Sequence, residues 1–160
     1  MTERRRPGVY LGCAGVLPQS RGSPAATMTD LVFFYGTLMT GFRRQGRAPL
    51  DRQLRAVGQG WIQAVLFDLG IYPAAIPADD GRVWGEVHQM LDPDAVLSAL
   101  DEIEGYSADE PDTSLYTRMV TPLTFEDGRV APVWVYFYNA PLGQAQRIES
   151  GDYLQHLKVK

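Results

Sequence analysis

Two runs of β-forming residues near the carboxyl end of the chain limit its fold most strongly. Residues 116–125 and 130–138 are rich in Val, Thr, Tyr and Phe, and residues 126–129, Glu-Asp-Gly-Arg, separate them. An Asp-Gly pair between two such runs is a strong signal for a β-hairpin. Further strands are predicted for residues 31–35, 61–69 and 83–90. Gly85 within the last strand indicates a close approach of another backbone or of a ligand.

The segments between these strands carry turn and helix signals. Residues 48–56 fit either a short helix or a loop, and residues 79–81, Asp-Asp-Gly, predict a tight turn. Residues 93–104 are predicted to form a helix, since Asp92 suits the N-cap and proline follows it at the first helical position. Glycine at position 105 is expected to end this helix.

Glu104 has an unexpected position in this helix. At about 100° per residue, with Leu97 set to zero, Glu104 falls at about 340° and Leu100 at about 300°, whereas Glu102 falls at about 140°. A carboxylate on the apolar face is costly unless it becomes neutral, finds a partner or opens onto a cavity. The last arrangement suits general acid–base catalysis. Alternatively, Glu104 bends back to solvent or pairs with Arg118 or another cation.

The sequence Tyr35-Gly36-Thr37-Leu38 is the second unusual element, because a hydrophobic strand runs directly into a glycine and a hydroxyl residue. Successive backbone N–H groups of such a turn can point into one concavity and bind a carboxylate or a developing oxyanion. The alternative interpretation is an ordinary turn after a strand.

Composition excludes several classes of function. A single cysteine allows no internal disulfide and fits a reducing compartment, so we expect a cytoplasmic protein. His88 and His156 lack metal-binding spacing, and no metal or cofactor is expected. The net charge of -4 argues against a nucleic-acid partner. No apolar stretch is long enough to span a membrane.

The first 28 residues differ in composition from the rest of the chain. They contain four arginines and one acid, whereas the remainder is acidic. We expect residues 1–28 to be a disordered N-terminal extension and residues 29–160 to form a single domain. The charged start and the following apolar stretch also outline a signal peptide, but Pro7, Gly12 and Gly15 interrupt it.

Several segments together resemble the gamma-glutamylcyclotransferase-like superfamily over about residues 31–153. They are residues 35–38 (YGTL), 66–73 (LFDLGIYP), 83–86 (VWGE), 100–106 (LDEIEGY), 116–118 (YTR), 134–136 (WVY) and 150–153 (SGDY). The resemblance implies an α+β fold, a small mixed β-barrel with flanking helices, and a cavity lined by the first segment. Thr37 is more similar to the gamma-glutamylamine cyclotransferase branch than to the glutathione-degrading branches.

The resemblance also implies a function. The expected reaction is the release of 5-oxoproline from a gamma-glutamyl amide, a small-molecule partner, by attack of its own α-amine without a cofactor. Glu104 matches the catalytic glutamate and would act as general acid and base. The N–H groups of residues 36–38 would hold the carboxylate or the oxyanion, and Tyr35 and Tyr116 would be walls or hydrogen-bond donors. The alternative is a non-catalytic member that binds a small ligand or a protein.

Overall fold

The computed structural model describes residues 29–40, 42 and 46–159, and the prediction of a disordered extension at residues 1–28 lies outside this range. The strands are β2 (Leu31–Phe34), β3 (Leu54–Asp68), β4 (Pro73–Met90), β5 (Tyr116–Phe125), β6 (Val130–Tyr138) and β7 (Gln146–Arg147). The α-helices are α2 (Pro93–Glu104) and α3 (Tyr153–Lys158), and the short 3-10 helices are η3 (Ala48–Gln53) and η4 (Pro111–Thr113).

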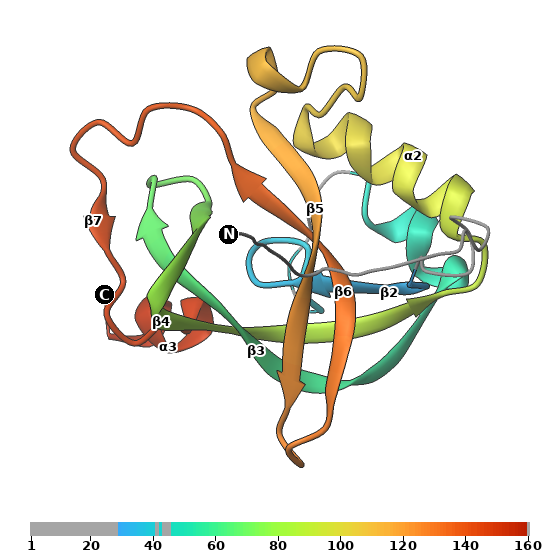
Figure 1. Cartoon of the computed structure of the whole chain (residues 1–160), viewed down its shortest axis with the longest axis horizontal. Helices are drawn as coiled ribbons and strands as arrows, with labels where there is room; N and C mark the ends of the chain where they lie inside the picture. Colours follow the sequence, from blue (N-terminus) through green and yellow to red (C-terminus); the bar gives the residue numbers. More distant parts are fainter. Residues whose placement is uncertain (1–28, 41, 43–45, 160) are drawn as a thin grey trace, which may run out of the picture.

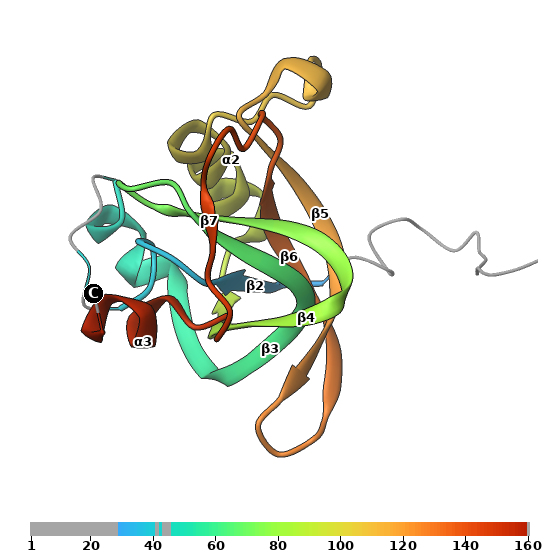
Figure 2. The same cartoon turned by 90° about the vertical axis from the view of Figure 1, so that its left-hand side faces the viewer.

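Five strands form a closed mixed barrel (Figures 1 and 2). The hydrogen-bonded order is β4-β2-β6-β5-β3, and pairing between β3 and β4 closes the ring. Among the described strands, β2 and β6 form the parallel pair and the other neighbours are antiparallel. Strand β7 extends the sheet by pairing with β3. The predicted α+β fold with a mixed barrel is therefore confirmed.

The strongest local sequence signals correctly predict the β5–β6 hairpin and helix α2. Strands β5 and β6 form the predicted hairpin, and the N–H of Phe125 donates to the carbonyl oxygen of Arg129 at 2.8 Å across the turn. In α2, the Asp92 carboxylate accepts a hydrogen bond from the N–H of Ala95 at 3.3 Å. Gly105 follows the helix with φ of 69°, a left-handed conformation that favours glycine.

Two predictions along the long β3–β4 pair are wrong. Strand β3 begins at Leu54 rather than at residue 61, because residues 54–60 pair with residues 85–90 at the end of β4. Residues 79–81 do not form a turn between separate strands, since β4 runs through them. The register shifts there: Gln63 pairs with Arg82 and Ala64 pairs with Pro77. The turn-forming residues are thus accommodated as an irregularity within one strand.

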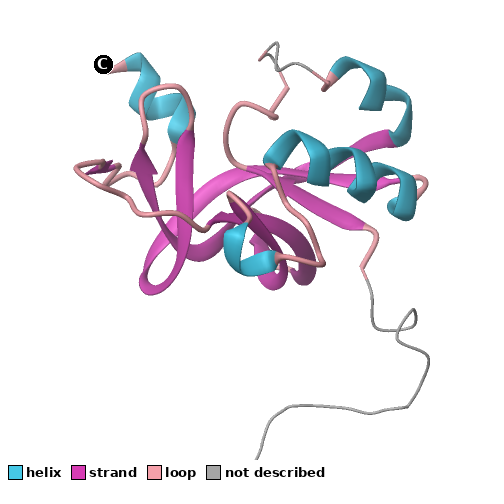
Figure 3. Ribbon diagram, turned by 90° about the horizontal axis from the view of Figure 1, so that it is seen from above, coloured by secondary structure: helices cyan, strands magenta, loops and turns pink. Residues whose placement is uncertain are grey.

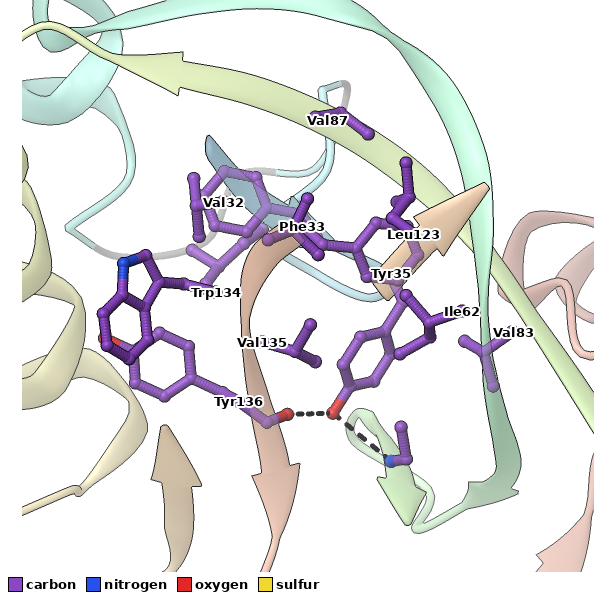
Figure 4. Packing of buried hydrophobic residues seen from close by; sticks show 14 of the residues in the cluster. Val32, Phe33, Tyr35, Ile62, Val83, Val87, Leu123, Trp134, Val135 and Tyr136 are labelled. Atoms are coloured by element: carbon purple, nitrogen blue, oxygen red, sulfur yellow. Dashed lines mark hydrogen bonds between the residues drawn. The ribbon is translucent and has the colours of Figure 1, made fainter. Parts of the chain in front are cut away.

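Strand β6 is covered on both faces. Figure 4 shows Trp134 and Tyr136 on one side of this strand and Val135 on the other side, among the residues of the barrel interior. Val135, Ile62 and Leu123 are fully buried inside the barrel. The Tyr136 hydroxyl reaches the carbonyl oxygen of Leu97 in α2, at 3.4 Å. Helix α2 therefore packs against the outer face of β6, and the barrel core fills its inner face.

The helices lie at separate places on the barrel. Figure 3 shows α2 and η3 near one end of the strands and α3 near the other end. None of the described helices is long and apolar enough to cross a membrane.

The close approach predicted at Gly85 is confirmed and gives a test of the barrel. A β-carbon at position 85 would lie 2.8 Å from the Phe33 ring and closer still to the carbonyl oxygen of Phe34. We expect Gly85→Ala to lower the free energy of unfolding by about 2 kcal/mol or more, because backbone and ring must move. Urea denaturation measures this change.

Gly58→Ala is the matched control. A β-carbon at Gly58, also in a strand, would lie 3.7 Å from its nearest neighbour, an ordinary contact with Phe125. We expect this variant to stay within about 0.5 kcal/mol of the wild type. Equal stability of the two alanine variants would contradict the close approach at Gly85.

Candidate active site

A cavity opens beside the carboxyl end of β2. It contains about 340 Å³ of empty space, including the part that is open to solvent. Its walls come from β2 and the residues after it, the start of β4, the end of α2, the start of β5 and the second half of β6. All six residues that the sequence analysis placed in a site line this cavity: Tyr35, Gly36, Thr37, Leu38, Glu104 and Tyr116. The fold thus brings together residues from three distant segments.

Glu104 reaches the cavity because it is the last residue of α2. It is 9% exposed and belongs to the buried face of the helix together with Leu97 and Leu100, as the helical periodicity predicts. Glu102 lies on the exposed face. Burial raises the pKa of the Tyr35 phenol far above its ordinary value, and the negative charge of Glu104 raises it further. The carboxyl group of Glu104 therefore acts electrostatically on the cavity wall.

A polar network fixes α2 one turn before Glu104. Arg118, which the sequence analysis considered as a partner for Glu104, forms a two-pronged salt bridge with Asp101, with distances of 2.9 Å and 3.2 Å. The Tyr136 hydroxyl donates to the same carboxylate at 2.6 Å. The guanidinium of Arg118 also lies over the Trp134 ring, 4.7 Å from its centroid. These contacts connect α2 to both strands of the β5–β6 hairpin.

Residues 36–40, here called the cavity loop, come after β2 and Tyr35. The N–H of Met39 donates to the carbonyl oxygen of Gly36 at 3.0 Å, which closes a turn. A β-carbon at position 36 would lie 2.7 Å from Cγ of Pro73. Glycine is therefore required here by the close approach of the loop to the start of β4.

The two predicted tyrosines use their hydroxyl groups to bridge backbone segments. The Tyr35 hydroxyl donates to the carbonyl oxygen of Tyr136 at 2.7 Å and accepts from the N–H of Ala75 at 3.3 Å, as the dashed lines in Figure 4 show. The Tyr116 hydroxyl donates to the carbonyl oxygen of Pro73 at 3.1 Å. Of the two roles predicted for these residues, the geometry favours that of walls.

Five residues that line the cavity were not predicted from the sequence. They are Phe33, Phe34, Tyr72, Pro73 and Tyr136. Tyr72 and Pro73 belong to a segment that carried the family resemblance, so their position in that segment was an available signal. Tyr136 also belongs to such a segment, residues 134–136, but it alternates with buried valines in β6 as an ordinary core tyrosine does.

Metal binding has no support in the geometry of the described residues. Within residues 29–40, 42 and 46–159, no three side chains of His, Cys, Asp or Glu are grouped so that they could hold a metal ion. His88 and His156 each contact one carboxylate, Glu86 and Asp68 respectively.

The fold and this site together define a class of protein. Its members have a closed mixed barrel, and a glutamate from a helix lies at the cavity. A family model described as gamma-glutamyl cyclotransferase, AIG2-like, matches residues 32–155, and the chain belongs to this family. The gamma-glutamylcyclotransferase family protein YtfP of Escherichia coli is 29% identical over 128 residues, which cover 79% of this chain and 98% of YtfP.

Solved structures agree with this assignment. The solution structure of YtfP from Escherichia coli has a TM-score of 0.54 at 28% identity, over 79% of this chain and 97% of that protein. The crystal structure of an AIG2-like protein from Mus musculus has a TM-score of 0.53 at 25% identity, over 70% of this chain and 80% of that protein. The predicted superfamily is therefore confirmed.

The network that orients α2 can be tested with Tyr136→Phe. This change removes the hydroxyl donor from a carboxylate that is largely shielded from solvent, while the ring remains. Hydrogen bonds to charged groups are among the stronger ones in proteins, so we expect a loss of about 1.5 kcal/mol in the free energy of unfolding. Chemical denaturation measures the loss.

Tyr138→Phe is the control for the same strand. Within the described part of the chain, no hydrogen bond involves the Tyr138 hydroxyl, and its ring packs edge-on against Tyr116 at 5.3 Å. This variant should unfold within about 0.5 kcal/mol of the wild type. A Tyr136→Phe protein as stable as Tyr138→Phe would show that the bond to Asp101 does not hold α2.

Proposed function

We propose that this protein is a cofactor-independent cyclotransferase that releases 5-oxoproline from a gamma-glutamyl amide. The observation that carries the proposal is the position of Glu104, which is the one charged side chain among the described residues that line the cavity. Membership of the gamma-glutamyl cyclotransferase, AIG2-like family supports this reaction class. The other side chains that line the cavity are largely aromatic. The Glu104 carboxyl group is therefore the candidate for proton transfer.

The substrate carries its own nucleophile. The nitrogen of its α-amine attacks the γ-carbonyl carbon, a new C–N bond closes the five-membered lactam, and the C–N bond to the leaving amine breaks. Because both reacting groups belong to one molecule, holding it in a folded conformation gives a high effective concentration. The protein has to fold the substrate, move a proton and stabilise negative charge.

Glu104 moves the proton in this mechanism. As a carboxylate it takes a proton from the attacking amine, and as a carboxylic acid it returns that proton to the leaving nitrogen. Burial reduces the free-energy difference between the charged and neutral forms of a carboxyl group. A buried carboxyl group beside the reacting nitrogen atoms can serve first as a base and then as an acid.

The cavity loop binds the negative charge. The backbone N–H groups around Gly36, Thr37 and Leu38 hold either the α-carboxylate of the substrate or the oxyanion that forms at the γ-carbonyl. Tyr35 and Tyr116 form walls, because each already donates its hydroxyl hydrogen to a backbone carbonyl. The rings also limit the access of water to the reacting atoms.

Glu104→Gln tests the proton carrier. We expect the variant to fold normally, because glutamine has the same shape, and to release 5-oxoproline at least about a hundredfold more slowly. The measurement is 5-oxoproline release from a panel of gamma-glutamyl amides. Far-UV circular dichroism and thermal unfolding check the fold.

Glu102→Gln provides the matched control, since Glu102 is two residues away on the exposed face of the same helix. It should turn over substrate at the wild-type rate. Release by Glu104→Gln at the wild-type rate would contradict the mechanism. Saturable binding of these amides to the wild-type protein without product would instead favour the non-catalytic binding protein considered in the sequence analysis.

A further inference from the structure

A carboxylate on β4 holds the cavity loop from outside the cavity. Thr40, the last residue of the loop, donates its backbone N–H to Oε1 of Glu86 at 2.9 Å. The Thr40 hydroxyl contacts the same oxygen at 3.1 Å, and Nε2 of His88 lies 3.1 Å from it. Three donors thus converge on one carboxylate oxygen. Glu86 itself is not among the residues that line the cavity.

The environment of Glu86 favours its ionised form. Burial by itself would raise the pKa of this carboxyl group, but the hydrogen bonds from His88 and Thr40 outweigh burial and lower the pKa below its ordinary value. A carboxylate only accepts hydrogen bonds, so Nε2 of His88 carries the hydrogen in this contact. The His88 ring packs on Phe34, with ring centroids 5.3 Å apart, and Phe34 lines the cavity.

Arg47 makes a second contact to the same loop. Its Nε donates to the carbonyl oxygen of Leu38 at 3.0 Å. Arg47 is 8% exposed, and its guanidinium lies 5.8 Å from the centroid of the Phe34 ring. An ion pair with Asp51 fixes the guanidinium further. The Leu38 carbonyl is therefore directed toward a buried cation that is not among the cavity-lining residues.

We propose that Glu86 and Arg47 are positioning residues that hold the cavity loop in its substrate-binding conformation. Glu86 fixes the end of the loop through Thr40, and Arg47 fixes its middle through the carbonyl group of Leu38. This inference rests on the proposed function, which assigns the binding of negative charge to the N–H groups of residues 36–38. Neither positioning residue touches the substrate, so each acts through the backbone of the loop.

The expected loss of activity follows from the sensitivity of backbone N–H donors to their position. Backbone N–H groups stabilise developing charge only when they already point at it before the reaction. A displacement of about 1 Å at a site can reduce the rate about a hundredfold. Hydrogen bonds to an ionised acceptor are among the stronger ones. Loss of the Glu86 acceptor therefore frees the Thr40 end of a loop that needs a defined conformation.

Two substitutions at Glu86 separate the acceptor from the charge. Glu86→Ala removes the acceptor for Thr40, and we expect kcat/KM for a gamma-glutamyl amide to fall at least about tenfold. Glu86→Gln keeps an oxygen that can accept from Thr40, and we expect it to remain within about threefold of the wild type. Hydrogen exchange of the Thr40 amide, followed by NMR, should be faster in Glu86→Ala and close to the wild-type rate in Glu86→Gln.

Arg47→Met gives a second test of the same loop, which remains available if Glu86→Ala does not fold. Methionine retains an unbranched apolar stem but cannot donate to the Leu38 carbonyl, so we expect kcat/KM to fall at least about tenfold. Asp127→Ala is the control. Asp127 also accepts from a backbone N–H, that of Arg129 at 3.0 Å, but in the exposed hairpin turn. It should leave kcat/KM at the wild-type value.

The outcomes distinguish the two proposals. Wild-type kcat/KM in Glu86→Ala, together with faster exchange at Thr40, would overturn the positioning role. Failure of the wild-type protein to release 5-oxoproline from any amide in the panel would overturn the proposed function. Even in that case, faster exchange at Thr40 in Glu86→Ala would support the anchoring of the loop, and unchanged exchange would overturn it.

Discussion

The docking of α2 on the outer face of β6 is the constraint on which the arrangement of the cavity depends. The Asp101 carboxylate accepts hydrogen bonds from the Tyr136 hydroxyl and from two nitrogen atoms of the Arg118 guanidinium. These contacts fix the rotation of the helix about its axis at this point. An exposed ion pair contributes little to stability, but this one is about four-fifths shielded and has defined hydrogen-bond geometry. Glu104 follows Asp101 by three residues, which is nearly one helical turn. Fixing Asp101 therefore also fixes the direction in which Glu104 points.

The barrel provides the rigid base for the other wall of the cavity. In the pairing of β2 with β4, Phe34 lies opposite Glu86. Glu86 is consequently placed beside the last residue of β2, at the point where the cavity loop leaves the sheet, and can reach Thr40. Gly85, the neighbour of Glu86, allows the two strands to approach closely. The same strand register thus determines the close packing of the barrel and the position of the carboxylate that holds the loop.

Local signals in the sequence were sufficient for those parts of the molecule that local chemistry determines. The β5–β6 hairpin follows from its Asp-Gly turn, α2 follows from its caps, and the direction of Glu104 follows from the helical period. The start of β3 was missed because its first residues are largely exposed and mix polar side chains with small and apolar ones, and only pairing with β4 makes them a strand. The turn signal at residues 79–81 falls at the register shift of the same pair of strands, where residues 78–81 have no partner in β3. The role inferred for Glu86 depends on contacts between residues 46 positions apart, which no local pattern indicates.

Electrostatics explains why the proposed chemistry centres on Glu104 rather than on the phenols around it. Burial raises the pKa of Tyr35 and of Tyr136 far above the ordinary value for tyrosine, and the charge of Glu104 contributes to both shifts. These phenols therefore stay in their neutral form near neutral pH. The field that disfavours their ionisation attracts a cation, and in the proposed reaction the α-ammonium group of the substrate is that cation. Transfer of one proton from this ammonium group to the Glu104 carboxylate gives the free amine that attacks, so one carboxylate both orients the nucleophile and activates it.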